Sequence, residues 1–174
     1  MIGLAGVELF ELVTHADPRG ALTETYQAAR YAHLGATFVQ DNLSTSRRGV
    51  VRGLHYQRTR PQGKLVTVVA GAIFDVVLDL RAGSSTFGRW AGVELTATNR
   101  RQLWIPPGCA HGFQATSDID AVVLYKLTAP YEPTDERAVR WDDPALAIRW
   151  PIAPALVSVR DRAAPALAAA ELPA

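Results

Sequence analysis

Short apolar segments recur along the chain, and glycine or proline separates them at intervals of about ten residues. Within the segments, apolar residues alternate with polar ones or run together over about five to eight positions, which is typical of antiparallel strands. Helical periodicity is weak. We therefore expect an all-β protein, with strands at residues 7–12, 37–41, 50–56, 64–80, 92–97, 102–105, 112–115 and 121–128.

The clearest pattern covers residues 64–80. Two β-branched runs flank Gly71, and the second run places alternate residues from Ile73 to Asp79 on one face. This pattern predicts a β-hairpin with its turn at Gly71. The segment Pro-Pro-Gly at 106–108 predicts another turn. Many short strands with such turns are typical of a sandwich or jelly roll, whose mouth can hold a small ligand.

The length of the chain fits one domain. Its 174 residues, 48% of them hydrophobic, can fill one well-packed core but are few for two. After Pro151 the sequence becomes rich in alanine and proline. We expect this part to be a partly helical or extended tail packed on the barrel, so that residues 1–174 form a single domain.

Charge and cysteine content exclude several classes of function. Eighteen basic and seventeen acidic residues give a net charge of +1, without the broad positive field that a nucleic-acid partner needs. No apolar run is long enough for a membrane helix, and the first ten residues lack the basic start of a secretion signal. The single cysteine, Cys109, rules out an internal disulfide. We expect a soluble, cytoplasmic protein with neither nucleic acid nor membrane as partner.

Cofactor and metal motifs are missing from the sequence. The chain contains no glycine-rich dinucleotide or phosphate loop, no nucleophile elbow and no His-Glu-x-x-His helix. His15, His33, His55 and His111 form no closely spaced pair of the kind that metal-binding jelly rolls use. We expect no cofactor and no metal, and chemistry by side chains alone. A metal site built from His55, His111 and a distant carboxylate remains the alternative.

A basic stretch runs from Arg47 to Lys64 without an acidic residue. It can attract an anionic ligand such as a diphosphate, or it can protect a solvated edge strand. His55 lies within it, where neighbouring cations favour the neutral, base-competent imidazole, although a lone strand histidine can also be structural. Arg52 and His55 are three positions apart and face opposite ways in a regular strand, so a shared site requires a bulge at Gly53.

Three other polar positions have two readings each. Tyr125 points inward if Lys126 points outward, either as a site residue or as a core tyrosine. Cys109 and His111 share a strand face, and we expect Cys109 to pack in the core. Asp142-Asp143, before proline, looks like a carboxylate pair but is also an ordinary turn sequence, which we favour.

Taken together, eight motifs resemble the dTDP-4-dehydrorhamnose 3,5-epimerase family, whose members are cupin-like jelly rolls. They follow the order and spacing of that family from about residue 17 to residue 165. The motifs are FVQDN (38–42), RGVVRGLHYQ (48–57), QGKLV (62–66), FDVVLDLR (74–81), STFGRW (85–90), NRRQLWIPPGCAHGF (99–113), LYK (124–126) and WDDPALAIRWP (141–151).

The resemblance implies a cupin-type jelly roll with a short helical or irregular C-terminal segment, and it implies roles for individual residues. In that family the histidine of Gly-Leu-His is a base oriented by a late aspartate, the tyrosine of Leu-Tyr-Lys is the acid, and the lysine after Gln-Gly stabilises an enolate. The corresponding residues here are His55, Asp161, Tyr125 and Lys64. Positions that match substrate contacts are Arg19, Glu24, Gln40, Asn42, Arg52, His111, Tyr131, Glu136 and Arg160.

The implied reaction converts dTDP-4-keto-6-deoxyglucose into dTDP-4-keto-L-rhamnose by inversion at C3 and C5. A ketone at C4 acidifies both neighbouring C–H groups, so one base and one acid on opposite ring faces can invert both centres without a cofactor. Tyr131 resembles the aromatic residue that stacks on thymine. Arg19 and Glu24 match residues that one subunit lends to the other, which implies a homodimer.

Two departures from the family pattern bear on specificity. Ala21-Leu22-Thr23 replaces the usual aromatics, which affects the packing where the subunits meet, and we expect Leu43, in place of a histidine, to remove a polar group near the pocket. Either change fits a relative that inverts one centre only, such as a 3-epimerase for an antibiotic sugar. A metal-dependent cupin and a sugar-nucleotide binder without turnover are the remaining alternatives. The motifs do not separate one inversion from two.

Overall fold

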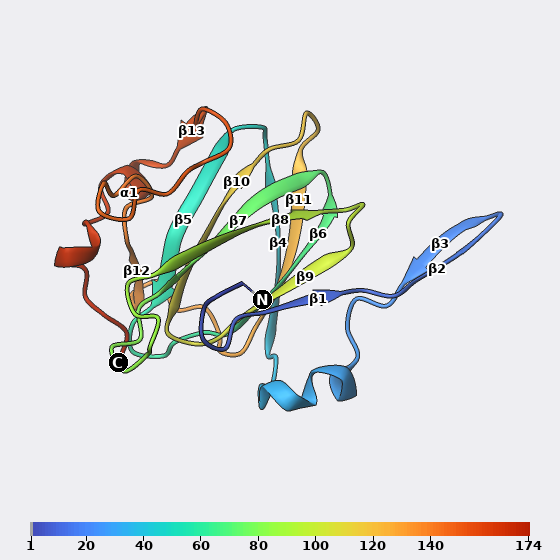
Figure 1. The fold of residues 1–174 in the computed structure, drawn as a ribbon, viewed down its shortest axis with the longest axis horizontal. Helices are drawn as coiled ribbons and strands as arrows, with labels where there is room; N and C mark the ends of the chain where they lie inside the picture. Colours follow the sequence, from blue (N-terminus) through green and yellow to red (C-terminus); the bar gives the residue numbers. More distant parts are fainter. Residues whose placement is uncertain (1) are drawn as a thin grey trace.

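The protein, described at residues 2–174 by a computed structural model, is built around two layers of antiparallel strands (Figure 1). The first sheet has the order β1 (Glu8–Glu11), β9 (Arg101–Ile105), β6 (Lys64–Ala70), β11 (Ala121–Leu127) and β4 (Gln40–Ser46). The second has the order β12 (Glu136–Ala138), β5 (Val50–Gln57), β10 (Cys109–Ala115), β7 (Ala72–Asp79) and β8 (Trp90–Thr96), and β13 (Leu156–Val157) pairs with β5 in parallel.

The main hydrophobic core lies between the two sheets. Val66 and Val123 of the first sheet pack in one cluster with Ile73, Val77 and Phe113 of the second, and each of these side chains is buried. Apolar burial of this kind is the main favourable contribution to folding, at about 25 cal/mol per Å². The expected all-β jelly roll of the cupin type is thus confirmed.

The outer face of the second sheet is covered by the C-terminal part of the chain. Leu54, Val76 and Leu78 form a second cluster, and Leu167 and Leu172 pack against it. This part contains β13, the short helix α1 (Val159–Arg162) and the 3-10 turn η2 (Leu167–Ala169). The prediction of a partly helical tail packed on the barrel is therefore confirmed.

The prediction of a hairpin at residues 64–80 is wrong. β6 pairs with β9 and β11, whereas β7 pairs with β8 and β10, so the chain changes sheets at Gly71. Gly71 has φ +71°, and a Cβ there would lie 2.5 Å from Ser117 Oγ. A tight turn between two apolar runs occurs both in a hairpin and at a corner between two sheets, because each arrangement buries one face of each run.

Most of the other expected strands appear with shifted ends. The strand expected at residues 37–41 begins at Gln40 and continues to Ser46 as β4. Among the elements that the pattern did not predict are a hairpin of β2 (Thr14–Asp17) and β3 (Gly20–Thr23) and the 3-10 helix η1 (Ala28–Leu34). These segments are only four to seven residues long, too short to show the periodic signal that identifies the longer strands.

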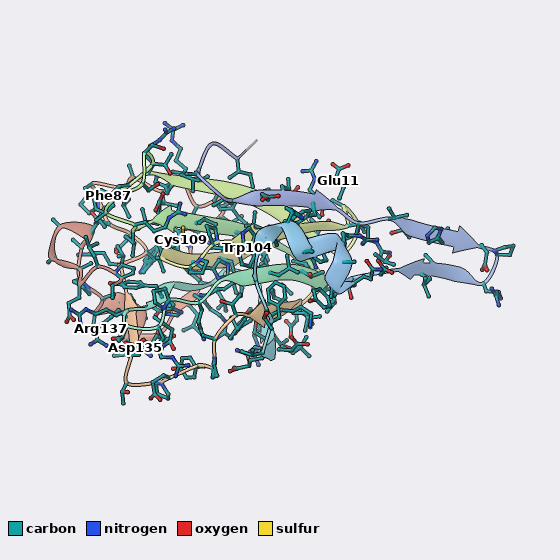
Figure 2. All side chains as sticks on the ribbon, turned by 90° about the horizontal axis from the view of Figure 1, so that it is seen from below. Glu11, Phe87, Trp104, Cys109, Asp135 and Arg137 are labelled. Carbon is teal, nitrogen blue, oxygen red and sulfur yellow. The ribbon has the colours of Figure 1, made fainter. Side chains whose placement is uncertain are left out.

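The β2–β3 hairpin projects away from the body of the molecule (Figure 1). Its strands pair only with each other among the described residues, and Leu22 is 69% exposed. A two-stranded hairpin is at best marginally stable alone in water. The opposite end of the molecule carries Asp135 and Arg137, while Cys109 lies in the interior (Figure 2).

Within residues 2–174, the model contains no helix of the length and apolar character that a membrane crossing requires.

Candidate functional site

A cavity of about 300 Å³ lies between the two sheets, next to the hydrophobic core. A volume of this size suits a small organic ligand. β4, β6 and β11 line it from the first sheet, and β5, β10 and β12 line it from the second. The lining residues are Asn42, Ser44, Arg52, His55, Gln62, Lys64, His111, Gly112, Phe113, Tyr125, Leu127, Tyr131 and Glu136.

His55 forms a close pair with Asp161. Its Nε2 lies 2.6 Å from Asp161 Oδ1, and Gly53 N donates to Asp161 Oδ2 at 3.3 Å. Helix α1 presents the aspartate, because Ser158 Oγ caps the helix by accepting from Asp161 N at 3.0 Å. Burial alone would raise the pKa of Asp161, but the hydrogen bonds from His55 and Gly53 outweigh it and the pKa is lowered. The pair therefore holds an ionised carboxylate against the imidazole.

A β-bulge brings Arg52 and His55 into the same cavity. His111 of β10 lies opposite His55 of β5, and Phe113 of β10 lies opposite Arg52 of β5. The two pairs are separated by two residues on β10 but by three on β5, so β5 carries one extra residue. Gly53 makes this possible. It has φ +114°, and a Cβ there would lie 2.6 Å from the backbone of Gly112. The bulge at Gly53 that a site shared by Arg52 and His55 requires is therefore present.

Lys64 lies buried in the cavity wall on β6, and its Nζ donates to the carbonyl of His55 at 3.3 Å. Burial lowers the pKa of Lys64 to about 8, although the charges of Glu136 and Asp75 act in the opposite direction. A protonated lysine in this position can meet a developing negative charge on a ligand oxygen, and with this pKa the amine becomes mostly neutral as pH rises above about 8.

Tyr125 lines the cavity from the wall opposite His55. It lies on β11, in register with Asn42 on β4 and Val66 on β6, whereas His55 belongs to the second sheet. The alternation with Lys126 predicted that Tyr125 points inward, and Tyr125 does line the cavity. Lys126 points outward, and its Nζ pairs with Asp41 at the surface. The cavity thus has an imidazole on one wall and a phenol on the other.

His111 forms a second histidine–carboxylate pair. Its Nε2 lies 2.8 Å from Asp75 Oδ2, and both side chains are buried. Burial lowers the pKa of His111, opposed by the charge of Asp75. Asp75 was not among the predicted site residues. The available signal was a carboxylate between Ile73 and Val77 on one strand face, since buried carboxylates are rare unless paired.

A set of polar side chains that bond to one another surrounds the mouth of the cavity. The hydroxyl of Tyr131 donates to Glu136 Oε2 at 3.0 Å, and Arg160 of α1 forms an ion pair with the same carboxylate. Gln40 accepts from the backbone of Tyr131 at 2.9 Å and donates to Asn42 Oδ1 at 2.8 Å. Five predicted contact residues therefore meet here.

Arg19 and Glu24 do not reach the cavity of their own chain. Arg19 lies at the turn of the β2–β3 hairpin, where its side chain is 90% exposed and pairs with Asp17. Glu24 pairs with Arg30 at 2.6 Å. Of the predicted substrate contacts, these two are separated from the rest.

Leu43 does not face the cavity either. Alternation along β4 directs Asn42 and Ser44 into the cavity and Leu43 to the outside, where it is 66% exposed. The expectation that Leu43 removes a polar group from the pocket of its own chain is therefore wrong, because the motif position was read without the strand alternation.

The remaining candidates resolve as follows. Cys109 is buried in the core, which raises the pKa of its thiol to about 12, so the packing reading is confirmed. Asp143 caps a turn, with its carboxylate accepting from the backbone of Ala145 at 2.9 Å, as favoured. Within the basic stretch only Arg52, His55, Gln62 and Lys64 line the cavity, and the other arginines are exposed. No group of three potential metal ligands occurs within residues 2–174.

Fold and cavity together define a jelly-roll protein with a small-molecule site between its sheets. The family model described as dTDP-4-dehydrorhamnose 3,5-epimerase matches residues 2–169. A dTDP-4-dehydrorhamnose 3,5-epimerase of Methanothermobacter thermautotrophicus is 49% identical over 151 residues, 86% of this chain and 81% of that protein. A dTDP-4-dehydrorhamnose 3-epimerase of Streptomyces niveus is 44% identical over 173 residues, 97% of this chain and 83% of that protein.

Among solved structures, a dTDP-6-deoxy-D-glucose-3,5-epimerase of Legionella pneumophila, in complex with dTDP-4-keto-L-rhamnose, superposes with a TM-score of 0.94. Its sequence is 46% identical, and the match covers 98% of this chain and 94% of the other. The chain belongs to the dTDP-4-dehydrorhamnose 3,5-epimerase family, and it is accordingly an isomerase.

Proposed function

We propose that this cavity epimerises dTDP-4-keto-6-deoxyglucose at C3 and C5 to dTDP-4-keto-L-rhamnose, with His55 as the base and Tyr125 as the acid. The observation that carries the proposal is their placement on opposite walls of one cavity. Inversion at carbon requires removal of a proton from one face and return of a proton to the other. A base and an acid on facing walls satisfy that requirement.

His55 takes the ring proton next to the C4 ketone, and the C–H electron pair moves into an enolate whose charge collects on the C4 oxygen. Asp161 occupies Nε2 of the ring, which leaves Nδ1 for the substrate, and its carboxylate stabilises the imidazolium that forms. Lys64 provides the fixed cation for the enolate oxygen. Tyr125 then gives its proton to the opposite face. Every step is a proton transfer, so the proposed reaction uses neither redox cofactor nor metal.

The polar residues around the cavity bind the nucleotide part of the substrate. Arginine guanidinium groups suit a diphosphate, and Arg52 and Arg160 supply them on β5 and α1. Tyr131, 43% exposed at the mouth, offers a ring face on which thymine can stack. The amides of Gln40 and Asn42, the carboxylate of Glu136 and the imidazole of His111 complete the proposed contacts to the substrate as a whole.

We also propose that the functional unit is a homodimer in which Arg19 and Glu24 complete the site of the partner. The β2–β3 hairpin supports this proposal, because it projects from the body, exposes Leu22 and has no pairing beyond its own two strands in the described chain. Docking on a second copy would bury that surface. We further infer one domain spanning residues 1–174 and a cytoplasmic location, which suits the free thiol of Cys109.

A 3-epimerase is the second candidate function, favoured by the 44% identity to the 3-epimerase of Streptomyces niveus. The two functions differ in how many carbons exchange hydrogen with solvent. Proton NMR of the product formed in deuterium oxide tests both. Deuterium at C3 and C5 supports the proposed function, whereas deuterium at C3 alone supports the 3-epimerase. Binding of the substrate without any deuterium incorporation would contradict both.

A further inference from the structure

β4 carries polar residues on its inward face, which an ordinary half-buried strand fills with apolar ones. Gln40, Asn42, Ser44 and Ser46 alternate along one face, directed between the sheets, while Leu43 on the other face is 66% exposed. A strand that only built the core would place apolar residues on this inward face. Such a departure from the local rule is expected where a strand serves a binding site.

Ser44 differs from the other three residues of this polar face. Gln40 and Asn42 bond to each other, and Ser46 Oγ accepts from Arg52 Nε at 2.8 Å. Ser44 Oγ is buried and has no hydrogen-bond partner within residues 2–174. A buried hydroxyl without a partner destabilises the folded protein relative to an alanine of similar shape, so its presence calls for a partner from outside the chain.

The register of the strands locates Ser44 at the inner end of the cavity. Gln40, at the mouth, lies opposite Leu127, which in turn pairs with Lys64. Ser44 lies four residues further along β4, about 13 Å at the usual rise per residue, opposite the buried Val123. Arg52 and Phe113 line the same cavity from the second sheet.

We propose that the Ser44 hydroxyl binds a hydroxyl group of the hexose ring of the substrate. The assignment rests on the proposed function. A phosphate is matched by guanidinium groups and the C4 oxygen by Lys64, whereas an uncharged hydroxyl in the cavity wall matches an uncharged ring hydroxyl of the hexose. A serine hydroxyl can donate to a sugar hydroxyl or accept from it, and rotation about χ1 moves it between staggered positions.

Binding of two nucleotides separates the hexose contact from the rest of the site. dTDP-glucose carries a hexose with its hydroxyls, and dTDP lacks the hexose. Titration calorimetry with the full-length protein measures both dissociation constants for wild type, Ser44→Ala and the control Thr45→Ala, whose side chain lies on the exposed face of β4. Thermal unfolding of each variant is measured in parallel.

We expect Ser44→Ala to weaken dTDP-glucose by about fivefold to tenfold, the usual effect of one neutral hydrogen bond, and to leave dTDP within about twofold. Its Tm should equal or exceed that of wild type, because no bond within the protein is lost. Thr45→Ala should change neither constant. Unchanged affinity of Ser44→Ala for dTDP-glucose, an equal loss for both ligands, or a lower Tm would overturn the assignment. Wild-type protein that binds neither nucleotide would instead overturn the proposed function on which it rests.

Discussion

His55 and Asp161 are 106 positions apart in the sequence, yet Nε2 of the imidazole and Oδ1 of the carboxylate lie 2.6 Å apart. The contact joins β5 of the second sheet to helix α1 of the C-terminal part, so it forms only where that part packs on the sheet. It fixes which ring nitrogen is available. Because Asp161 occupies Nε2, only Nδ1 remains free for a ligand, and the orientation of the imidazole depends on a helix of four residues.

His55→Ala should abolish the exchange of ring hydrogens with solvent, because the variant has no base beside Lys64 to form the enolate. We expect a loss on the order of a hundredfold or more. The measurement is deuterium incorporation into the substrate by NMR. Unaltered binding of dTDP would show that the fold of the variant is intact, and near-normal exchange in that case would remove His55 from the proposed role.

Tyr125→Phe should separate exchange from inversion. The phenol is lost but the ring remains, so His55 can still take a proton and return it to the same face. Deuterium should therefore enter the substrate while formation of the inverted product falls on the order of a hundredfold or more. The ratio of exchange to inversion, measured in one NMR time course, should rise above the wild-type value. A variant that inverts as fast as wild type would show that the acid is another group.

Lys64 should give the reaction an alkaline limit. Burial lowers the pKa of this lysine to about 8, and the cationic form that stabilises the enolate is the protonated one. Activity should therefore be present below about pH 8 and decline as pH rises through that value. Lys64→Arg keeps a cation at all accessible pH values, so its residual activity should lack this decline, whereas Lys64→Met should lose activity at every pH. The test is the pH dependence of kcat for the three proteins.

The jelly roll was predictable because its signal is local. Apolar segments of five to eight residues between turns recur at β5, β6, β7 and β11, and each of these strands is buried over much of its length, β6 and β7 as continuous buried runs. Which strands pair is not a local property. Residues 64–80 were predicted as a hairpin, and the structure shows a corner between sheets at Gly71, because the choice depends on β9, β10 and β11, which come later in the chain.

The site was less predictable from residue patterns alone. His55 and Tyr125 stood out as polar groups on apolar segments, but no spacing connects His55 with Asp161, and only the family resemblance suggested that pair. Asp75 was missed, since its function depends on the cross-strand position of His111. Leu43 was misjudged, because a motif shows which residue is present and not which way the strand turns it.

Chelators should leave the activity unchanged. Nε2 of His55 is bound to Asp161, and Nε2 of His111 is bound to Asp75. The two histidines therefore do not form a preformed pair of metal ligands. Treatment with EDTA followed by gel filtration should give the kcat of the untreated enzyme. Loss of activity that one divalent metal restores would favour the metal-dependent cupin instead.

Sharing of the site between subunits predicts complementation between two inactive variants. Arg19→Ala removes a residue that the proposed dimer lends to the partner subunit, and the Arg19 side chain is 90% exposed in its own chain, so folding should be unaffected. His55→Ala removes a residue of the cavity itself. In a mixed dimer, the cavity of the Arg19→Ala subunit receives an intact Arg19 from the His55→Ala subunit, so one complete site forms.

Random mixing of equal amounts makes half of the dimers mixed, each with one of two sites intact, so about a quarter of the wild-type activity should return. The two proteins are unfolded together and refolded, or co-expressed, and assayed against each variant alone. Arg89→Ala, at an exposed arginine outside the cavity and the hairpin, serves as the control and should be fully active by itself. If the mixture stays as inactive as its components while gel filtration shows dimers, Arg19 acts within its own chain and the shared-site dimer is wrong. Full activity of Arg19→Ala alone would contradict the shared site as well.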